Sequence, residues 1–128
     1  QWSNRLRLFL NRRLFLGLFS FESHFSHYPS GAFYKKHVDA FKGNPLKDST
    51  NRVLSVVAYF NPCWQPEDDG ELAMFNEEEV EPFLCVTPAY GTLVVFLSED
   101  FPHEVLPAKR SRYSLTGWFR VNTPADVL

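Results

Sequence analysis

The sequence contains little cysteine: Cys63 and Cys85 are the only two among 128 residues. They could form one disulfide, but two free thiols in a reducing cytoplasm are the expectation. Long apolar runs are absent too, because no run reaches the roughly 20 residues that a membrane-spanning helix requires. We therefore expect a cytoplasmic protein without a membrane partner.

An excess of one charge sign is also missing. Thirteen Lys and Arg residues against fifteen Asp and Glu residues give a net charge of −2, so no overall field favours nucleic acid. No basic groove with interleaved aromatic residues is visible, which disfavours oxidative demethylation of nucleic acid. The chain also has no Gly-rich phosphate loop, no βαβ alternation and no internal repeat.

Aromatic and aliphatic residues are abundant. The chain is 45% hydrophobic and 16% aromatic, with thirteen Phe, which argues against disorder and favours a compact, sheet-rich fold. A chain of this length corresponds to one domain and buries roughly two thirds of its unfolded surface.

Residues 2–15 have apolar side chains close to helical spacing, which predicts a helix laid against a sheet and ended by Gly17. The apolar positions are Trp2, Leu6, Phe9, Leu10 and Leu14, and the arginines Arg5, Arg7, Arg12 and Arg13 lie between them. We interpret the arginines as the solvated face of the helix. A signal peptide at Arg12-Arg13-LFLGLFSF is the alternative, but the apolar run is short and no small-residue cleavage site follows it.

The rest of the chain alternates short β-type segments with turn signals. Strands are predicted at 18–25, 33–41, 52–60, 71–75, 84–88, 91–98, 103–107 and 112–121. Turns or loops are predicted at 28–31, 42–51 and 61–70. Glu77, Glu78 and Glu79 are interpreted as a solvated turn, since a calcium loop would need a different spacing. Regular strand spacing of this kind indicates a sandwich or barrel.

The most informative stretch is His37-Val38-Asp39, within the predicted strand 33–41. Two residues apart on a strand, the imidazole and the carboxylate would share a face, with Cα atoms ~6.6 Å apart. A second histidine, His103, follows far downstream. Two histidines and one carboxylate with other positions open form the facial triad of non-haem Fe(II) oxygenases.

The last predicted strand adds a polar stripe to this pattern. Its members are Arg112, Ser114, Thr116 and Trp118. Every second residue of a strand faces the same side, and the opposite face here carries Tyr113, Leu115 and Phe119. A polar stripe of this kind fits a barrel interior that holds a charged small molecule.

The chain resembles the prolyl-hydroxylase branch of the 2-oxoglutarate/Fe(II)-dependent dioxygenases, and most of all bacterial relatives of the animal oxygen-sensing prolyl hydroxylases. The resemblance covers roughly residues 28 to 121 and is carried by YKKHVD (34–39), NRVLSVVAYFNPCW (51–64), DGELAMF (69–75), GTLVVFLSEDFPHEVLPA (91–108) and RYSLTGWF (112–119). It implies a mainly β double-stranded β-helix, or jelly roll, with one or few bracing helices at the N-terminus. It also implies that residues 1–128 form a single catalytic domain, which lacks part of the family's N-terminal helical region.

The resemblance also implies roles for particular residues. His37, Asp39 and His103 match the iron ligands. Arg112 and Tyr59 match residues that bind the distal carboxylate of 2-oxoglutarate. Two further residues, Tyr28 and Thr116, match residues of the cosubstrate pocket, although the turn that contains Tyr28 is one residue shorter than that of the family. Trp118 and Arg52 fall where relatives touch the peptide substrate.

The function implied is hydroxylation of a prolyl residue in a protein substrate, with succinate and CO₂ as co-products. Fe(II), 2-oxoglutarate and O₂ are the implied cofactors, ascorbate is a possible reductant, and a translation GTPase is one candidate substrate for a monomeric enzyme. Two alternatives stay open: a hydroxylase of a free amino acid or small metabolite, and a non-catalytic sensor of iron or oxoglutarate. The loop 42–51 is a candidate substrate lid, because it follows the ligand strand.

Overall fold

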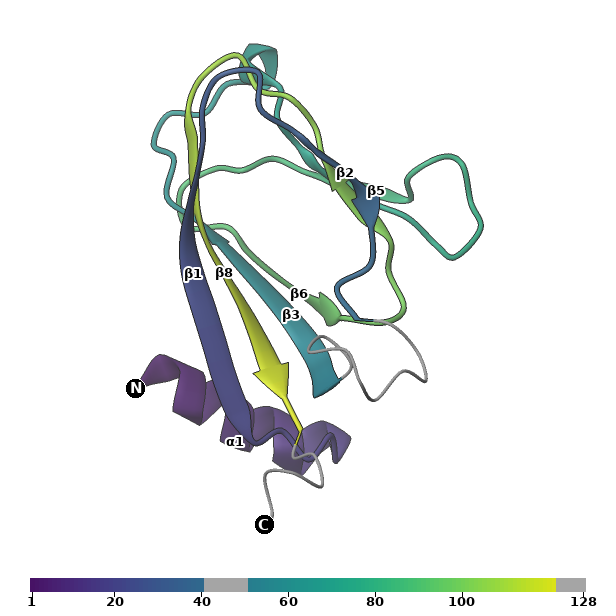
Figure 1. Ribbon diagram of the computed structural model, residues 1–128. Coiled ribbons are helices and arrows are strands. Elements are labelled where there is room, and N and C mark those ends of the chain that lie inside the picture. Colours follow the sequence, from purple (N-terminus) through teal and green to yellow (C-terminus); the bar gives the residue numbers. More distant parts are fainter. Residues whose placement is uncertain (41–50, 122–128) are drawn as a thin grey trace.

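Two antiparallel sheets face each other, and a helix packs against the lower part of one of them (Figure 1). The structure is a computed structural model that describes residues 1–40 and 51–121. The first sheet has the order β1-β8-β3-β6, and the second has the order β2-β7-β4-β5. Except for β4 and β5, which follow each other in the chain, neighbours in each sheet come from distant parts of the sequence, which is typical of the strand order of a jelly roll.

The strands of the first sheet are long and those of the second sheet are short. The first sheet contains β1 (Ser20–Tyr28), β8 (Arg112–Arg120), β3 (Arg52–Tyr59) and β6 (Leu93–Leu97). The second contains β2 (Tyr34–His37), β7 (His103–Val105), β4 (Leu72–Met74) and β5 (Leu84–Val86). A short 3₁₀ helix, η2 (Pro66–Asp68), lies in the connection between β3 and β4.

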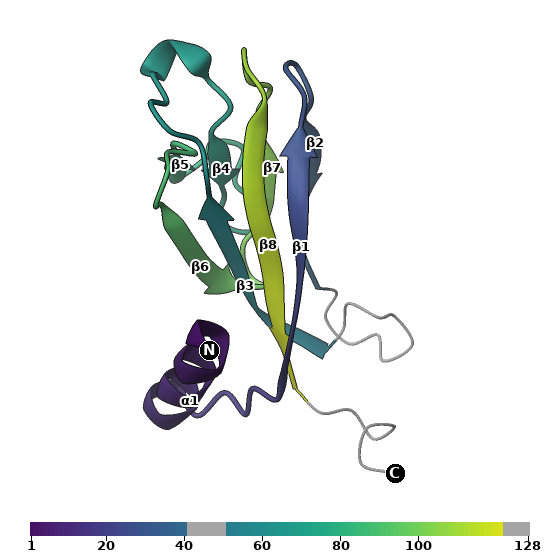
Figure 2. The same ribbon diagram turned by 90° about the vertical axis from the view of Figure 1, so that its left-hand side faces the viewer.

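Alternation along β3 and β8 divides the first sheet into an outer and an inner face. On the outer face, Leu54, Val56 and Phe119 form a buried cluster with Leu18. Helix α1 (Trp2–Leu14) covers this cluster, with Leu6 and Leu10 packed against it. Figure 2 shows α1 beside the lower ends of the first sheet's strands. The inner face, which looks toward the second sheet, carries the polar side chains of a cavity, and Phe96 on β6 packs there with Leu72 and Met74 of β4.

The mainly β jelly roll with one N-terminal helix is confirmed, but several predicted boundaries are wrong. The helix ends at Leu14 rather than at Gly17, because Phe15 takes a left-handed conformation (φ 53°) and its N–H donates to the Asn11 carbonyl. The side-chain amide of Asn11 then bonds both the N–H and the carbonyl of Leu18. This amide fixes the helix to the start of the sheet.

The two strands beside the predicted turn 28–31 also differ from expectation. The strand predicted at 18–25 runs from Ser20 to Tyr28, because each residue of it pairs with β8 up to Tyr28 opposite Arg112. The strand predicted at 33–41 ends at His37, so Asp39 lies in a bend beyond it. The backbone N–H of Asp39 donates to the Ser98 carbonyl instead of to a neighbouring strand of the second sheet.

Two smaller predictions agree with the structure. Cys63 and Cys85 are free and exposed, and Glu77 to Glu79 lie in an exposed turn. Within residues 1–40 and 51–121, no helix is long and apolar enough to cross a membrane. The candidate lid at 42–51 lies outside the described residues except for Asn51.

Candidate active site

Three side chains from two distant parts of the chain meet between the sheets. His37 comes from the end of β2, Asp39 from the bend after it, and His103 from the start of β7, which pairs with β2. Asp39 Oδ1 lies 3.4 Å from His37 Nε2 and 3.2 Å from His103 Nε2. One ligand atom from each residue lies within 4.8 Å of the others, so all three can bind one metal ion.

The two imidazoles are oriented by backbone carbonyls. His37 Nδ1 lies 2.7 Å from the Lys35 carbonyl, and His103 Nδ1 lies 3.0 Å from the Phe101 carbonyl. A carbonyl can only accept, so each Nδ1 carries the proton and donates it. When the imidazoles are neutral, each Nε2 therefore keeps its lone pair for a metal, as is usual when the other ring nitrogen is fixed by an acceptor. When they are protonated and no metal is bound, each Nε2 donates to Asp39 Oδ1 instead.

Asp39 is a buried carboxylate that is held in its charged form. Burial alone would raise its pKa, but hydrogen bonds from His103, His37 and Ser55 lower the pKa of this carboxyl far below its usual range. For His37, burial would lower the pKa, and the hydrogen bond to Asp39 raises it above its usual value. A cation beside Asp39 is therefore favoured, whether it is a proton shared with the imidazoles or a metal ion.

The donor set fits a ferrous ion. Ligands about 2.1 Å from a first-row metal and at right angles are about 3 Å apart, close to the spacing of these nitrogens from Asp39 Oδ1. Two imidazoles and one carboxylate on one side of the metal leave coordination positions open, which is the arrangement of non-haem Fe(II) oxygenases. The carboxylate that the sequence placed on a strand reaches the same site from a bend.

Arg112, at the start of β8, is a buried cation across the cavity from these ligands. It is 3% exposed, and its guanidinium donates to the carbonyls of Gly70 and Leu106. Among residues 1–40 and 51–121, no carboxylate forms an ion pair with it. Burial lowers the pKa of Arg112, yet arginine stays protonated. A buried positive charge without a protein anion is suited to an anionic ligand.

Two tyrosines surround this guanidinium. Its carbon lies 4.6 Å from the ring centroid of Tyr28, and Tyr59 from β3 is also buried. Burial raises the pKa of Tyr59 to about 12, and burial also raises the pKa of Tyr28. Both phenols therefore stay neutral at physiological pH and can donate O–H groups to the anion that Arg112 attracts.

A cavity of about 470 Å³ joins the ligand cluster to Arg112. All nine residues assigned from the resemblance line it: His37, Asp39, His103, Arg112, Tyr59, Tyr28, Thr116, Trp118 and Arg52. Apolar side chains from both sheets, among them Val57, Leu72 and Val105, complete the wall. The volume is sufficient for a small dicarboxylate and part of a second substrate.

The side of the cavity away from Arg112 carries a stacked arginine. The Arg52 guanidinium carbon lies 3.8 Å from the ring centroid of Trp118, and Arg52 Nε donates to Glu22 Oε1 over 3.1 Å. Arg120 binds the same carboxylate oxygen. Burial alone would raise the pKa of Glu22, but the bonds from Arg120 and Arg52 lower it. The cation–π contact and the ion pair together fix Arg52 at the cavity rim.

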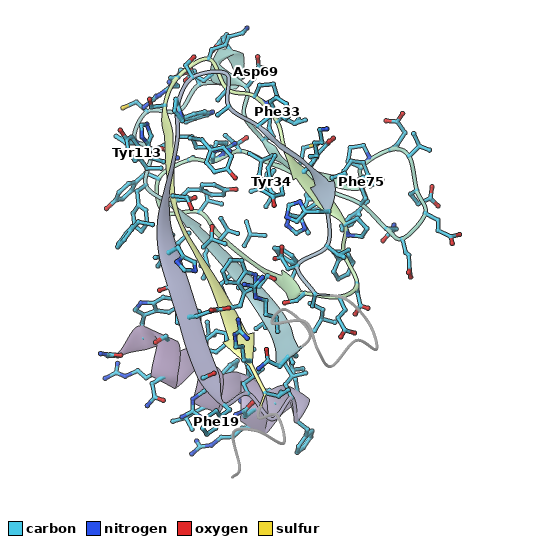
Figure 3. The ribbon with its side chains drawn as sticks, viewed as in Figure 1. Phe19, Phe33, Tyr34, Asp69, Phe75 and Tyr113 are labelled. Atoms are coloured by element: carbon cyan, nitrogen blue, oxygen red, sulfur yellow. The ribbon has the colours of Figure 1, made fainter. Side chains whose placement is uncertain are left out.

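Several cavity residues were not found from the sequence. His24 and Ser26 on β1 line the cavity, and the His24 ring contacts Trp118 edge-on at 5.8 Å between centroids. Tyr34 on β2 also lines it and points between the sheets, whereas Tyr113 lies on the outer side of β8 (Figure 3). Period-two alternation back from Tyr28 identifies Ser26 and His24, but only when Tyr28 is counted as part of the strand. His27, on the other face, is exposed and stacks on Tyr113.

A candidate metal site and a buried cation inside a jelly roll fit a metal-dependent oxygenase, and comparison with known proteins identifies the family. Residues 23–120 match the 2OG-Fe(II) oxygenase superfamily. The chain is 35% identical over 102 residues to the hypoxia-inducible factor prolyl hydroxylase of Caenorhabditis elegans, which covers 77% of this chain and 13% of that protein.

Solved structures show the same relationship. A Pseudomonas putida prolyl-4-hydroxylase is 52% identical, with a TM-score of 0.82, over 94% of this chain and 63% of that chain. A Trichoplax adhaerens prolyl hydroxylase in complex with a hypoxia inducible factor peptide is 31% identical, with a TM-score of 0.76, over 92% of this chain and 52% of that chain. This chain belongs to the 2OG-Fe(II) oxygenase superfamily, whose metal is Fe(II) and whose cosubstrates are 2-oxoglutarate and O₂. It spans less than two thirds of the length of these relatives.

Proposed function

We propose that this chain hydroxylates a prolyl residue of a protein or peptide, consuming 2-oxoglutarate and O₂ and releasing succinate and CO₂. The observation that carries the proposal is the pairing of two features in one cavity: the His37, Asp39 and His103 cluster, and the buried Arg112 with no protein carboxylate in the described residues. Relatives at 35% and 52% identity named as prolyl hydroxylases support the choice of substrate.

The chain's own residues would bind and orient both substrates. His37, Asp39 and His103 would hold Fe(II), which when bound supplies the redox chemistry by which O₂ oxidises 2-oxoglutarate and a substrate C–H bond. Arg112 would bind the far carboxylate of 2-oxoglutarate bidentately, because its planar fork matches two carboxylate oxygens. Tyr59 would donate its phenolic proton to the same carboxylate.

Charge balance makes the filled cavity tolerable in a low dielectric. Asp39 and a 2-oxoglutarate dianion contribute three negative charges, and Fe(II) and Arg112 contribute three positive charges, so the assembly is formally neutral. Val57, Leu72 and Val105 would exclude water from it. No general base is required, because the hard chemistry belongs to the metal and cosubstrate.

Anaerobic loading followed by exposure to O₂ tests the proposal. Protein loaded with Fe(II) and 2-oxoglutarate should release succinate in amounts above those of a His37→Ala control, and faster with a suitable prolyl peptide. The peptide should gain 16 Da at proline by mass spectrometry, and prolyl segments of a translation elongation GTPase are the first set to try. Succinate release that no peptide accelerates would favour a free amino acid or small metabolite as substrate; no succinate above the control would contradict catalysis.

A further inference from the structure

The two oxygens of the Asp39 carboxylate have different surroundings. Oδ1 faces His37 and His103, at 3.4 and 3.2 Å. Oδ2 accepts two hydrogen bonds, from Ser55 Oγ at 2.6 Å and from Trp118 Nε1 at 3.0 Å. The carboxylate is therefore fixed about its χ2 torsion, which is broad and two-fold in an unrestrained Asp. Only one of its oxygens is left for a metal.

The Ser55 donor is itself directed by a second buried hydroxyl. Ser55 and Ser98 are both fully buried, and their Oγ atoms lie 2.8 Å apart. An ionised carboxylate can only accept, so the Ser55 proton points to Asp39, and the Ser98 hydroxyl must donate to Ser55. The Ser98 carbonyl also accepts the backbone N–H of Asp39. Ser98 thus supports both the backbone and, through Ser55, the side chain of the ligand.

The second donor links Asp39 to the rim of the cavity. Trp118 lies opposite Ser55 in the β3–β8 register, which brings both donors to the same carboxylate oxygen. Its indole is half-buried, and Arg52 stacks on one face of the ring at 3.8 Å. Glu22 in turn holds Arg52. The indole N–H is therefore aimed at Asp39 by contacts on both strands beside β8.

From this geometry we propose that Ser55 and Trp118 are positioning residues that keep Asp39 as a single-oxygen ligand. The inference rests on the proposed function. A carboxylate can bind a metal through one or both oxygens, and a second Asp39 oxygen would occupy a position that the cosubstrates need. Two donors on Oδ2 oppose that change, since both hydrogen bonds to a charged acceptor would have to break. The two residues thus set how many positions stay open, without touching the reacting atoms.

Metal binding tests the inference without relying on turnover. Ser55→Ala and Trp118→Phe each delete one donor, and Trp118→Phe keeps an aromatic ring beneath Arg52. Each should weaken Mn(II) binding, measured by electron paramagnetic resonance, about tenfold or more, as is typical for groups that orient a ligand. Each should also change the visible absorption of Co(II)-loaded protein, because this absorption depends on ligand number and geometry.

Two further variants make the result specific. Ser23→Ala changes an exposed serine on the outer face of β1 and should match the parent in both measurements. Ser98→Ala should give a smaller loss than Ser55→Ala, because Ser98 acts only through Ser55 and the backbone. Circular dichroism establishes whether each variant is folded. If the Ser55→Ala protein does not fold, the metal binding of the Trp118→Phe protein tests the inference.

Two outcomes would overturn the inference. The first is a folded Trp118→Phe protein with Mn(II) affinity within twofold of the parent and an unchanged Co(II) spectrum. The second is a parent protein that binds neither Mn(II) nor Co(II), which would remove the proposed function as well. The first outcome leaves the proposed function intact, so the two failures are distinguishable.

Discussion

Arg112 and Tyr28 lie directly opposite each other on β8 and β1, and the guanidinium of the first stacks on the ring of the second at 4.6 Å. The pairing joins a residue near the start of the described chain to one near its end. It places a buried cation against the carbonyl oxygens of Gly70 and Leu106 and the aromatic face of Tyr28.

Replacing Arg112 with Lys should weaken 2-oxoglutarate binding and leave metal binding unchanged. Lysine keeps the charge but not the bidentate fork, and a lost hydrogen bond to a charged group costs about 1.5–3 kcal/mol. The KM for 2-oxoglutarate should therefore rise roughly 10-fold to 100-fold in a succinate assay. Arg110→Lys, at a neighbouring arginine that packs over Trp64, is the matched control. An Arg112→Lys protein with parental KM would show that the anchor lies elsewhere.

Replacing Gly70 with Ala should destabilise the fold at the Arg112 anchor. Gly70 has φ +78°, and a Cβ there would lie 2.5 Å from Ala108 Cβ. Overpacking of this kind costs about 1–3 kcal/mol. A backbone movement that relieves the clash would shift the Gly70 carbonyl, which accepts a hydrogen bond from Arg112. Gly31→Ala is the control, because Gly31 has φ +86° with nothing within 4 Å of the added Cβ. Urea unfolding should show a loss for Gly70→Ala well beyond that for Gly31→Ala; equal losses would contradict the steric argument.

Stability should fall at alkaline pH because of Tyr59. Its folded pKa of about 12 lies above the ordinary value of 10, so between these values the unfolded chain releases a proton that the folded chain keeps. The contribution of the neutral phenol to stability is complete below pH 10 and is lost as the pH rises toward 12. At pH 11 the free energy of unfolding should be lower by on the order of 1 kcal/mol. Urea unfolding from pH 9 to 11 should show this decline, and Tyr59→Phe should flatten it. The control Tyr90→Phe, at an exposed tyrosine, should keep it.

Replacing Glu22 with Gln should affect the peptide and not 2-oxoglutarate. Glu22 binds Arg52 and Arg120, and without its charge Arg52 is less firmly held over Trp118. The KM for a prolyl peptide should rise several-fold while the KM for 2-oxoglutarate stays within twofold. Glu67→Gln, at an exposed residue of η2, is the control. A parallel rise in both constants would mean that Glu22 acts on the whole cavity rather than on its rim.

The sequence by itself determined the sheet-rich fold and most of the site. Period-two alternation from Arg112 predicted the inward stripe of β8 correctly, since side-chain direction along one strand depends only on local geometry. The three candidate ligands were predicted from their residue types, because imidazole and carboxylate are the groups that Fe(II) sites of this kind use, and the structure brings them together. The single-domain organisation and the roles of individual residues stay predictions until they are measured.

The tertiary structure decided where strands end and which distant side chains meet, because local geometry along one segment does not determine these features. Pairing with β8 extended β1 to Tyr28 and so turned Ser26 and His24 toward the cavity. The bond from the Asp39 N–H to the Ser98 carbonyl ended the ligand strand at His37. Hydrogen bonds between residues far apart in the chain exist only once two sheets are stacked, so no pattern within one segment could show that Ser55 and Trp118 share an oxygen of Asp39.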